Sequence, residues 1–229
     1  MKKIAVLTGA GISAESGLAT FRGAGGLWEG HNIYEVATPE AWEKNPAMVL
    51  RFYNQRRRDI RLAQPNAAHK ALVLLEEYFH VSIITQNIDD LHERAGSTNV
   101  FHLHGEILKA RSSIDDKVLY DLGEKDIEMG DFCDRGSQLR PHVIWFGEAV
   151  SGIYEAMDIV QQVDLLVVIG TSLAVYPAAS LVPGATNASD IFIVNPEIPS
   201  SVSEAGFHLI RETACAGVPP LVDRLCRTF

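Results

Sequence analysis

The sequence feature that most constrains the fold is a short apolar run followed at once by a glycine-rich turn. Residues 4–7 read IAVL and residues 9–14 read GAGISA. The apolar run suits a strand buried on both faces of a parallel sheet. The turn fits the G-x-G-x-x-A form, whose glycines let backbone N–H groups approach a pyrophosphate while a helix beginning near Ser13 directs its positive end there. These six residues also fit a tight strand-to-helix turn that binds no ligand, so both readings stay open for this motif alone.

A second glycine cluster follows at residues 21–28, which read FRGAGGLW. It is too polar and flexible for a helix interior and predicts a mobile loop able to close over a ligand, with Phe21 and Arg22 at its base. Together, residues 9–28 strongly resemble the signature of the sirtuins, the NAD-dependent protein lysine deacylases. The resemblance implies NAD as cofactor and acylated lysine proteins or peptides as substrates.

Length, composition and charge bound the alternatives. The 229 residues, 47% hydrophobic and 21% charged, suit one large globular domain or a domain with an inserted module. A net charge of -9 disfavours a general nucleic-acid binder. No apolar run approaches the roughly 18 residues of a membrane span. The three cysteines, at positions 133, 215 and 226, form no close pair, which predicts a reduced cytoplasmic protein.

Helical patterns dominate residues 28–80, and within residues 47–62 the spacing places Tyr53 and Arg56 on one side of a helix. By itself the run of arginines at 56–58 favours a solvated basic face. The Tyr-x-x-Arg spacing, however, matches the pair found in sirtuins that remove succinyl and malonyl groups. The resemblance therefore implies that Tyr53 and Arg56 select a negatively charged acyl group, because a guanidinium can bind a carboxylate bidentately.

Polar residues follow the strand predicted at residues 81–85, where the chain reads Gln86-Asn87-Ile88-Asp89. Side chains at the carboxyl end of a strand lie where open α/β sheets bind ligands. The alternative is an Asx turn that caps the next helix. The string TQNIDDLHERAG matches the sirtuins, and the resemblance implies that these residues surround the nicotinamide and its ribose.

Two of the eight histidines occur in the run HLHGE at residues 102–106. Gly105 lets a ligand or backbone come close to His104, and an unperturbed imidazole titrates near neutrality, as proton transfer at physiological pH requires. The second histidine matches the family's catalytic base, so His104 is chosen over His102. The resemblance also implies that Asn87 and Asp89 position the ribose and a water molecule.

Residues 107–140 depart from the family. Sirtuins usually carry here a small ribbon that binds zinc through four cysteines in two pairs, whereas this chain has Cys133 alone, with Ser112 and Ser113 in the region of the first pair. One thiolate cannot form a tetrahedral sulfur site. We therefore predict no metal ligands and a zinc-free ribbon held together by apolar residues, namely Ile107, Leu108, Val118, Leu119 and Phe132.

The other predicted site residues lie at later strand ends. Residues 139–148 form an extended run that is either a buried edge strand or a strand that pairs with a substrate backbone. The resemblance implies substrate contacts by Val143, Phe146, Gly147 and Glu148. Strands predicted at 164–169 and 191–194 end in residues that suit phosphate or ribose contact. The full set of predicted cofactor-binding residues is Gly9, Ala10, Gly11, Ser13, Ala14, Glu15, Thr20, Phe21, Arg22, Trp28, Gln86, Asn87, Ile88, Asp89, His104, Gly170, Thr171, Ser172, Asn195, Pro196, Glu197 and Ala214.

These patterns predict an α/β fold, a Rossmann-like parallel sheet with a smaller inserted module that has a helical part and a degenerate zinc-ribbon-like part. The predicted NAD-binding domain comprises residues 1–26, 68–104 and 142–229, and the module comprises residues 27–67 and 105–141. The implied reaction removes acetyl, succinyl or malonyl groups from lysine and yields nicotinamide, O-acyl-ADP-ribose and free lysine. We expect a cytoplasmic monomer that binds neither nucleic acid nor membrane. A protein ADP-ribosyltransferase and a non-catalytic acyl-lysine reader remain as alternatives, and a hydride-transfer dehydrogenase is disfavoured.

Overall fold

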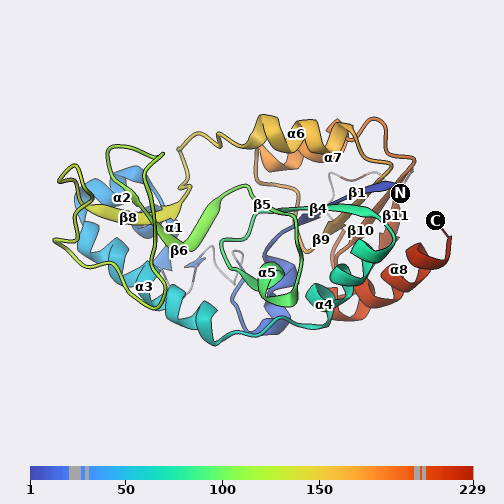
Figure 1. Cartoon of the computed structure of the whole chain (residues 1–229), viewed down its shortest axis with the longest axis horizontal. Coiled ribbons are helices and arrows are strands. Elements are labelled where there is room, and N and C mark those ends of the chain that lie inside the picture. The colour runs from blue at the N-terminus through green and yellow to red at the C-terminus, as the bar shows by residue number, and fades with distance from the viewer. Residues whose placement is uncertain (21–26, 29–30, 199–201, 203–204, 229) are drawn as a thin grey trace.

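The computed structural model describes residues 1–20, 27–28, 31–198, 202 and 205–228, with only the backbone described for 27–28. Phe21, Arg22 and the glycine cluster, predicted as a closing loop, lie outside the described residues, as does the side chain of Trp28. Figure 1 shows the described chain as two parts, a sheet with helices on both faces and a smaller part made of helices and short strands.

The larger part is a six-stranded parallel sheet in the order β11-β10-β9-β1-β4-β5. Central β1 pairs with β4 on one side and with β9 on the other, so Thr8 lies in register with Thr85 and Ile169. The polar turns that follow these three strands therefore meet at one edge, as the predicted Rossmann-like fold requires. The strands are β1 (Lys3–Thr8), β4 (His80–Thr85), β5 (Val100–His102), β9 (Leu165–Ile169), β10 (Asp190–Val194) and β11 (His208–Ile210).

Helices cover both faces of this sheet because alternate residues of each strand point to opposite faces. Ile4 and Val6 of β1 pack with residues of α4 (Ala67–Leu74) and α8 (Ala214–Thr228). Ala5 and Leu7 pack instead with residues of α6 (Ile153–Gln161) and α7 (Leu181–Gly184). The two helix pairs lie on opposite sides of the sheet in Figure 1. All four β1 residues are fully buried, which confirms the strand predicted from the IAVL run.

The turn after β1 differs from the prediction. A helix beginning near Ser13 was expected, but residues 10–16 form two short 3₁₀ turns, η1 (Ala10–Ile12) and η2 (Ala14–Ser16). Gly17, with φ of 87°, adopts the left-handed conformation and ends the second turn. The predicted helix beginning near Ser13 is therefore wrong.

The glycines of this turn are needed for a contact between two loops. A Cβ on Gly9 would lie 2.8 Å from the carbonyl oxygen of Gly170, and one on Gly11 would lie 2.6 Å from the Cα of Gly170. The Gly9 N–H donates to Ile169 O at 3.0 Å, and the Gly11 N–H donates to Gly170 O at 2.8 Å. These two N–H groups therefore join the β1 turn to the β9 turn.

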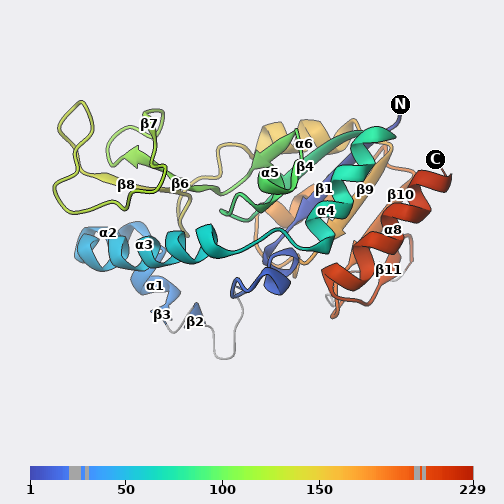
Figure 2. The ribbon, with the colours of Figure 1, turned by 60° about the horizontal axis from the view of Figure 1, so that its bottom comes forward.

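The smaller part contains two separate insertions that pack together. The first forms β2 (Leu27–Trp28), β3 (His31–Asn32), α1 (Ile33–Val36), α2 (Pro39–Lys44) and α3 (Pro46–Leu62). The second forms a three-stranded antiparallel ribbon in the order β7-β6-β8, from β6 (Gly105–Ser112), β7 (Leu119–Asp121) and β8 (Leu139–Val143). Figure 2 shows α3 beside this ribbon. Short elements η3 (Leu75–Glu77), α5 (Leu91–Ala95) and η4 (Ala178–Ser180) belong to the sheet side.

The apolar core of the ribbon differs from the predicted one. Ile107 is fully buried, but Leu119 is 44% exposed and Phe132 is 62% exposed, so the prediction for these two residues is wrong. Side chains alternate along a strand, and on β7 it is the neighbouring Tyr120 that packs inward. The cluster that forms consists of Leu50, Ala110 and Ile127, with Trp42, Tyr120, Leu122 and Leu139 packed against it.

Polar side chains of α3 also hold the ribbon, and we call Asn54, Arg57, Arg58 and Arg61 the α3 latch. Asn54 donates to Ile127 O at 2.9 Å and accepts from Ile127 N at 3.1 Å. Arg57 is 0% exposed and donates from Nε to Ile107 O at 2.8 Å, while Arg58 pairs with Asp126. The predicted solvated basic face is therefore wrong for Arg57, which is a buried structural residue.

Candidate active site

A cavity of about 810 Å³ opens at the carboxyl ends of β1, β4, β9 and β10 and extends to the smaller part. Every predicted site residue whose side chain the structure describes lines this cavity. The predicted site residues whose side chains are not described are Phe21, Arg22 and Trp28. The predicted residues that line the cavity are Gly9, Ala10, Gly11, Ser13, Ala14, Glu15, Thr20, Tyr53, Arg56, Gln86, Asn87, Ile88, Asp89, His104, Val143, Phe146, Gly147, Glu148, Gly170, Thr171, Ser172, Asn195, Pro196, Glu197 and Ala214.

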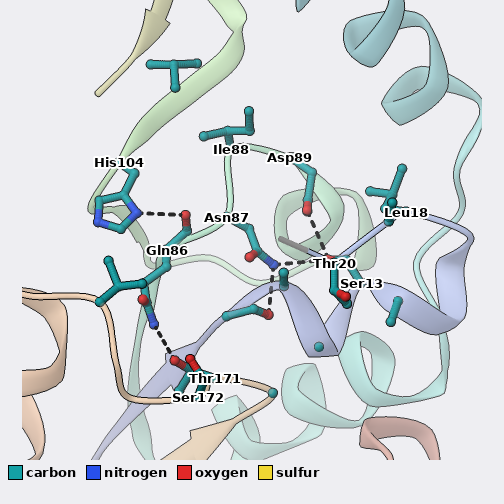
Figure 3. A pocket seen from close by; sticks show the side chains of 18 of the residues that line it. Ser13, Leu18, Thr20, Gln86, Asn87, Ile88, Asp89, His104, Thr171 and Ser172 are labelled. Carbon is teal, nitrogen blue, oxygen red and sulfur yellow. Dashed lines mark hydrogen bonds between the residues drawn. The ribbon is translucent and has the colours of Figure 1, made fainter. Parts of the chain in front are cut away.

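Ser13 links the two polar residues that follow β4. Asn87 donates from Nδ2 to Gly9 O at 3.2 Å and to Ser13 Oγ at 3.1 Å, and the Ser13 hydroxyl donates to Asp89 Oδ2 at 3.0 Å. Figure 3 shows these hydrogen bonds side by side. Both side chains are more than nine-tenths buried. The Asx-turn alternative is also present, since Asp89 accepts from Leu91 N at 3.2 Å, so one loop both starts α5 and presents polar groups to the cavity.

Burial raises the pKa of Asp89 because the charged carboxylate loses solvation. Hydrogen bonds from the Leu91 N–H and the Ser13 hydroxyl act in the opposite direction, as does the positive charge of nearby His102. The carboxylate therefore sits in a site that both withdraws it from water and supplies donors to its charged form.

His104 is held by a backbone carbonyl on the wall of the cavity. Its Nδ1 lies 3.1 Å from Gln86 O, as Figure 3 shows, and because a carbonyl only accepts, Nδ1 carries the proton. Burial lowers the pKa of this imidazole, which favours the neutral ring. Neutral His104 therefore keeps Nε2 as an unprotonated acceptor, the state that a general base needs.

Gly105 is required by the backbone rather than by a ligand. Its φ is 84°, and a Cβ at this position would lie 2.3 Å from the carbonyl oxygen of His142 on β8. The close approach predicted beside His104 is thus an approach of two strands. It fixes the start of β6, and with it the position of the histidine.

Tyr53 and Arg56 lie on adjacent turns of α3 and both line the cavity, as the i, i+3 spacing predicts. Tyr53 is fully buried and packs against Phe52 and Trp145, and Arg56 is 6% exposed with Nη2 at 3.4 Å from Ala19 O. Burial raises the pKa of Tyr53, so the phenol stays protonated and can donate a hydrogen bond. The two side chains offer one cation and one hydroxyl to the same cavity.

Two predicted site residues have structural partners as well. Glu148 accepts from Arg140 Nη1 at 2.6 Å, from Arg111 Nη2 at 3.0 Å and from Trp145 N at 2.7 Å. Burial opposes its ionisation, but the hydrogen bonds from Arg140 and Trp145 outweigh this and lower its pKa. The Glu148 carboxylate is therefore occupied with joining the ribbon to the loop after β8.

Glu15 makes a similar contact on the sheet side. Its carboxylate accepts from Thr213 Oγ1 at 3.1 Å and from Cys215 N at 2.8 Å. It thus fixes the start of α8 beside Ala214.

The cavity also includes residues that sequence reasoning missed. Trp145 lies between predicted residues in the sequence and could have been inferred from that position. The others are mostly small or apolar, and their pattern gave no signal. The missed residues are Leu18, Ala19, Ala37, Ile60, Ile144, Trp145, Ala149, Val150, Val175, Tyr176, Pro177, Val194 and Thr213.

The ribbon does not offer the ligands of a zinc site. Within the described residues, no group of three or more His, Cys, Asp or Glu side chains could hold a metal ion. The neighbours of Cys133 Sγ are the hydroxyls of Ser137 at 3.0 Å and Ser112 at 3.5 Å, and these two hydroxyls lie 2.7 Å apart. A hydrogen-bonded cluster of one thiol and two hydroxyls thus lies around Cys133, and the two hydroxyls lower the pKa of the thiol to about 7. One sulfur and two serine hydroxyls do not fit a tetrahedral zinc site.

The fold and cavity define an α/β protein of the Rossmann-like class with an imidazole and two buried polar side chains at the strand ends. The model of the Sir2 family matches residues 9–177, and the chain belongs to this family. It is 52% identical over 225 residues to an NAD-dependent protein deacylase of Helicobacter pylori J99, covering 98% of this chain and 96% of that protein. It is 45% identical to one of Bacteroides thetaiotaomicron, covering 98% of each.

Solved structures agree with this assignment. A Sir2 homologue in complex with NAD superposes with a TM-score of 0.87 at 40% identity, covering 99% of this chain and 90% of that chain. An S24A mutant of a Sir2 homologue in complex with ADP-ribose gives a TM-score of 0.88 at 39% identity, covering 99% and 92%. In the part of the chain that the structure describes, no helix has the length and apolarity needed to cross a membrane.

Proposed function

We propose that this Sir2-family chain is an NAD-dependent protein deacylase that removes acetyl, succinyl or malonyl groups from lysine. The products would be nicotinamide, O-acyl-ADP-ribose and free lysine. The observation that carries the proposal is the convergence of His104, Asn87 and Asp89 on a cavity that Tyr53 and Arg56 also line. Relatives named as NAD-dependent protein deacylases, at 45–52% identity over nearly the whole chain, support it.

His104 is proposed as the general base. Its Nδ1–H is fixed on Gln86 O, which orients Nε2, and burial favours the neutral ring. Nε2 would accept a proton from a ribose hydroxyl. A positioned base of this kind contributes about 10²- to 10⁴-fold to a rate.

Asn87 and Asp89 are proposed to position the ribose and a water molecule. Their link through Ser13 fixes both side chains relative to the turn after β1. A carboxylate at Asp89 can accept from a hydroxyl, and the Asn87 amide has both a donor and an acceptor. NAD, when bound, would supply the electrophilic ribose carbon and the nicotinamide leaving group.

The NAD site is proposed along the strand ends. The cavity volume of about 810 Å³ suits a ligand of this size. The turn after β1 and residues 170–172 would face the phosphates, with Gln86 held in place by its 3.2 Å hydrogen bond to Thr171 Oγ1. Asn195 and Ala214, which line the cavity at β10 and α8, would face the adenosine.

Arg56 and Tyr53 are proposed to select the acyl group. A succinyl or malonyl group ends in a carboxylate, which a guanidinium binds through charge-assisted hydrogen bonds and a phenol can reinforce. Val143, Phe146, Gly147 and Glu148 are proposed to line the path of the acyl-lysine, with Glu148 acting through its contacts to the loop after β8.

The organisation of the chain is part of the proposal. Residues 1–26, 68–104 and 142–229 would form the NAD-binding domain, and residues 27–67 and 105–141 the inserted module. The hydroxyl cluster around Cys133 supports a module without zinc. We also propose a cytoplasmic monomer with three reduced cysteines, and the net charge of -9 supports a protein that binds no nucleic acid.

The test compares deacylation of acetyl-lysine and succinyl-lysine peptides by three variants. His104→Ala should lower kcat by about 10²- to 10⁴-fold with both peptides while NAD binding persists. Arg56→Met should lower kcat/KM for the succinyl peptide by about 10- to 100-fold and spare the acetyl peptide. Arg51→Met, on the exposed side of the same helix, is the matched control and should change neither.

Two outcomes would contradict these assignments. If Arg56→Met lowered kcat/KM equally for both peptides, Arg56 would have no role in selecting the acyl group. Transfer of ADP-ribose to the peptide, with the lysine still acylated, would replace deacylation by ADP-ribosyl transfer.

A further inference from the structure

The two histidines of the HLHGE run make parallel contacts with the loop after β4. His104 Nδ1 lies 3.1 Å from Gln86 O, and His102 Nδ1 lies 3.2 Å from Asn87 O. Two rings on one segment thus hold two consecutive carbonyls of the loop that presents Asn87 and Asp89.

Their second ring nitrogens differ. His104 lines the large cavity, whereas His102 Nε2 lies 2.6 Å from Glu93 Oε1 on α5. Both ring nitrogens of His102 therefore face acceptors, a carbonyl and a carboxylate. Only the imidazolium can donate to both at once.

We propose that His102 is a positioning residue, a charged clamp between Glu93 and the Asn87 carbonyl that holds the 86–89 loop in its working geometry. This inference rests on the proposed function, because the groups it positions are those assigned to deacylation.

The surrounding charges favour the clamp. Burial opposes protonation of His102, whose side chain is 9% exposed, but Glu93, Glu106 and the Asn87 carbonyl together raise its pKa. Lys109 is paired through Nζ with Glu106 at 2.9 Å, and its charge helps to keep the pKa of Glu93 low.

Four more charged or titratable groups face this region. Asp90 is paired with Arg94 at 3.5 Å, and burial keeps His92 on α5 neutral by lowering its pKa. The clamp favours the ionised form of Asp89, because the charge of His102 lowers the pKa of Asp89 whereas burial raises it. His102, Glu93, Glu106, Asp89 and Asp90 all line a small cavity of about 80 Å³ behind the loop.

Deprotonation should release the loop. A neutral ring keeps one N–H, and the Glu93 carboxylate competes for it better than the Asn87 carbonyl because a charged acceptor forms the stronger hydrogen bond. The Nδ1 lone pair would then face Asn87 O without a proton between them. The rate should therefore fall on the alkaline side as His102 loses its proton, while the acid side follows protonation of His104.

The first variant removes the clamp. His102→Leu keeps the side-chain bulk but no donor, and it should lower kcat by about tenfold or more, with KM for NAD changed less than about twofold. The alkaline fall of kcat should disappear. The matched control is His208→Leu, which breaks another histidine–carboxylate pair of 2.7 Å, to Asp190, at β11 and should leave kcat and its pH profile unchanged.

The second variant keeps the clamp but removes its charge. In Glu93→Gln the amide can donate to Nε2 of a neutral His102, which then keeps Nδ1–H on Asn87 O. This variant should retain kcat within about twofold at pH 7 and lose the alkaline fall. A merely structural role for the pair would instead lower the melting temperature and the active fraction without changing the pH profile.

An NMR measurement tests the clamp without activity. In protein labelled with ¹⁵N-histidine at pH 6.5, the His102 ring, assigned by its loss in His102→Leu, should show two protonated nitrogens, because its pKa is raised above 6.5, and His104, whose pKa is lowered, should show one. A singly protonated His102, or a wild-type alkaline limb that persists in His102→Leu, would overturn the inference. Wild-type protein that deacylates neither peptide, yet shows the doubly protonated ring, would contradict the proposed function and leave the clamp standing.

Discussion

The sheet domain and the inserted module are stabilised in different ways. In the sheet, β1 and β9 are buried along almost their whole length and apolar side chains cover both faces. In the module, the small apolar cluster of Leu50, Ala110 and Ile127 is supplemented by the α3 latch. An amide and two arginines of the latch hold backbone groups of the ribbon, and the third arginine, Arg58, pairs with the carboxylate of Asp126.

This difference supports the proposed zinc-free module, because hydrogen bonds hold its ribbon. Asn54, Arg57 and Arg61 satisfy carbonyls of the segment that a metal would otherwise organise, and Ser112, Cys133 and Ser137 bond to one another at the strand ends. Hydrogen bonds are individually weak, at about 0.5–1.5 kcal/mol net, but leaving buried groups unpaired costs more. We therefore expect the module to be the more fragile of the two regions.

The largest expected effect comes from the sheet core. Leu7→Ala removes a fully buried side chain at the centre of β1, between β4 and β9, and should lower the free energy of unfolding by about 4 kcal/mol in urea denaturation. Leu119→Ala, at a leucine that is 44% exposed on β7, is the matched control and should cost less than about 0.5 kcal/mol. Equal losses of unfolding free energy in the two variants would contradict the idea that apolar burial stabilises the sheet more than the ribbon.

The sheet domain contains a buried histidine, His69, that should make its stability fall in acid. His69 on α4 is 0% exposed and packs against buried His92, and burial lowers its pKa from 6.5 to about 4. Because the unfolded chain gains this proton at higher pH than the folded one, stability is full above pH 6.5 and falls as the pH drops toward 4. The lowering of the His69 pKa from 6.5 to about 4 corresponds to a loss of about 3 kcal/mol in the free energy of unfolding at low pH.

Urea denaturation of wild type and His69→Leu across this range measures the effect. The variant should lose less stability than wild type between pH 6.5 and 4, so the two curves converge or cross as the pH falls. Parallel curves would show that His69 does not titrate as a buried neutral group.

In the module, loss of the latch should matter more than loss of apolar surface. Asn54→Ala removes the paired hydrogen bonds to Ile127 and an acceptor 2.6 Å from Arg57 Nη1, and should cost about 2 kcal/mol. Hydrogen exchange should increase in residues 119–139 but not in the sheet. Gln55→Ala, at an exposed amide on the same helix, is the control, and equal exchange in the two variants would count against the latch.

The smallest expected effect is that of chelation. If the ribbon holds no zinc, prolonged treatment with a chelator should leave the melting temperature within about 1 °C. Cys133→Ser should change stability by less than about 0.5 kcal/mol, because a hydroxyl can replace the thiol between Ser112 and Ser137. Bound zinc found by elemental analysis and lost with a drop in melting temperature would show that the ligands were misread.

The sheet and its site were predictable because their signals are local in the sequence. Each apolar strand ends in the polar residues that line the cavity, so a strand predicted from IAVL or DLLVVI also locates Gly9 or Thr171. Parallel pairing then brings these ends together without further information.

The module was harder to predict because its contacts join distant positions. Arg57 and Asn54 bond to residues 50 and 73 positions away, and no helical period reveals these contacts. A run of three arginines by itself therefore predicts a solvated face. The exposure of Leu119 depends on which face of β7 meets the core, and that is set by its pairing with β6. Likewise, the 3₁₀ turns after Gly9 follow from the contact with Gly170, which lies far along the chain.

The most direct test of the central claim is nicotinamide release by purified, chelator-treated protein offered acetyl-lysine and succinyl-lysine peptides separately. We predict peptide-dependent release with the lysine freed in both cases, and a higher kcat/KM for the succinyl peptide. Release that requires added zinc would contradict the account of the module. No release with either peptide, with or without zinc, would contradict the assignment of the cavity as a deacylase site.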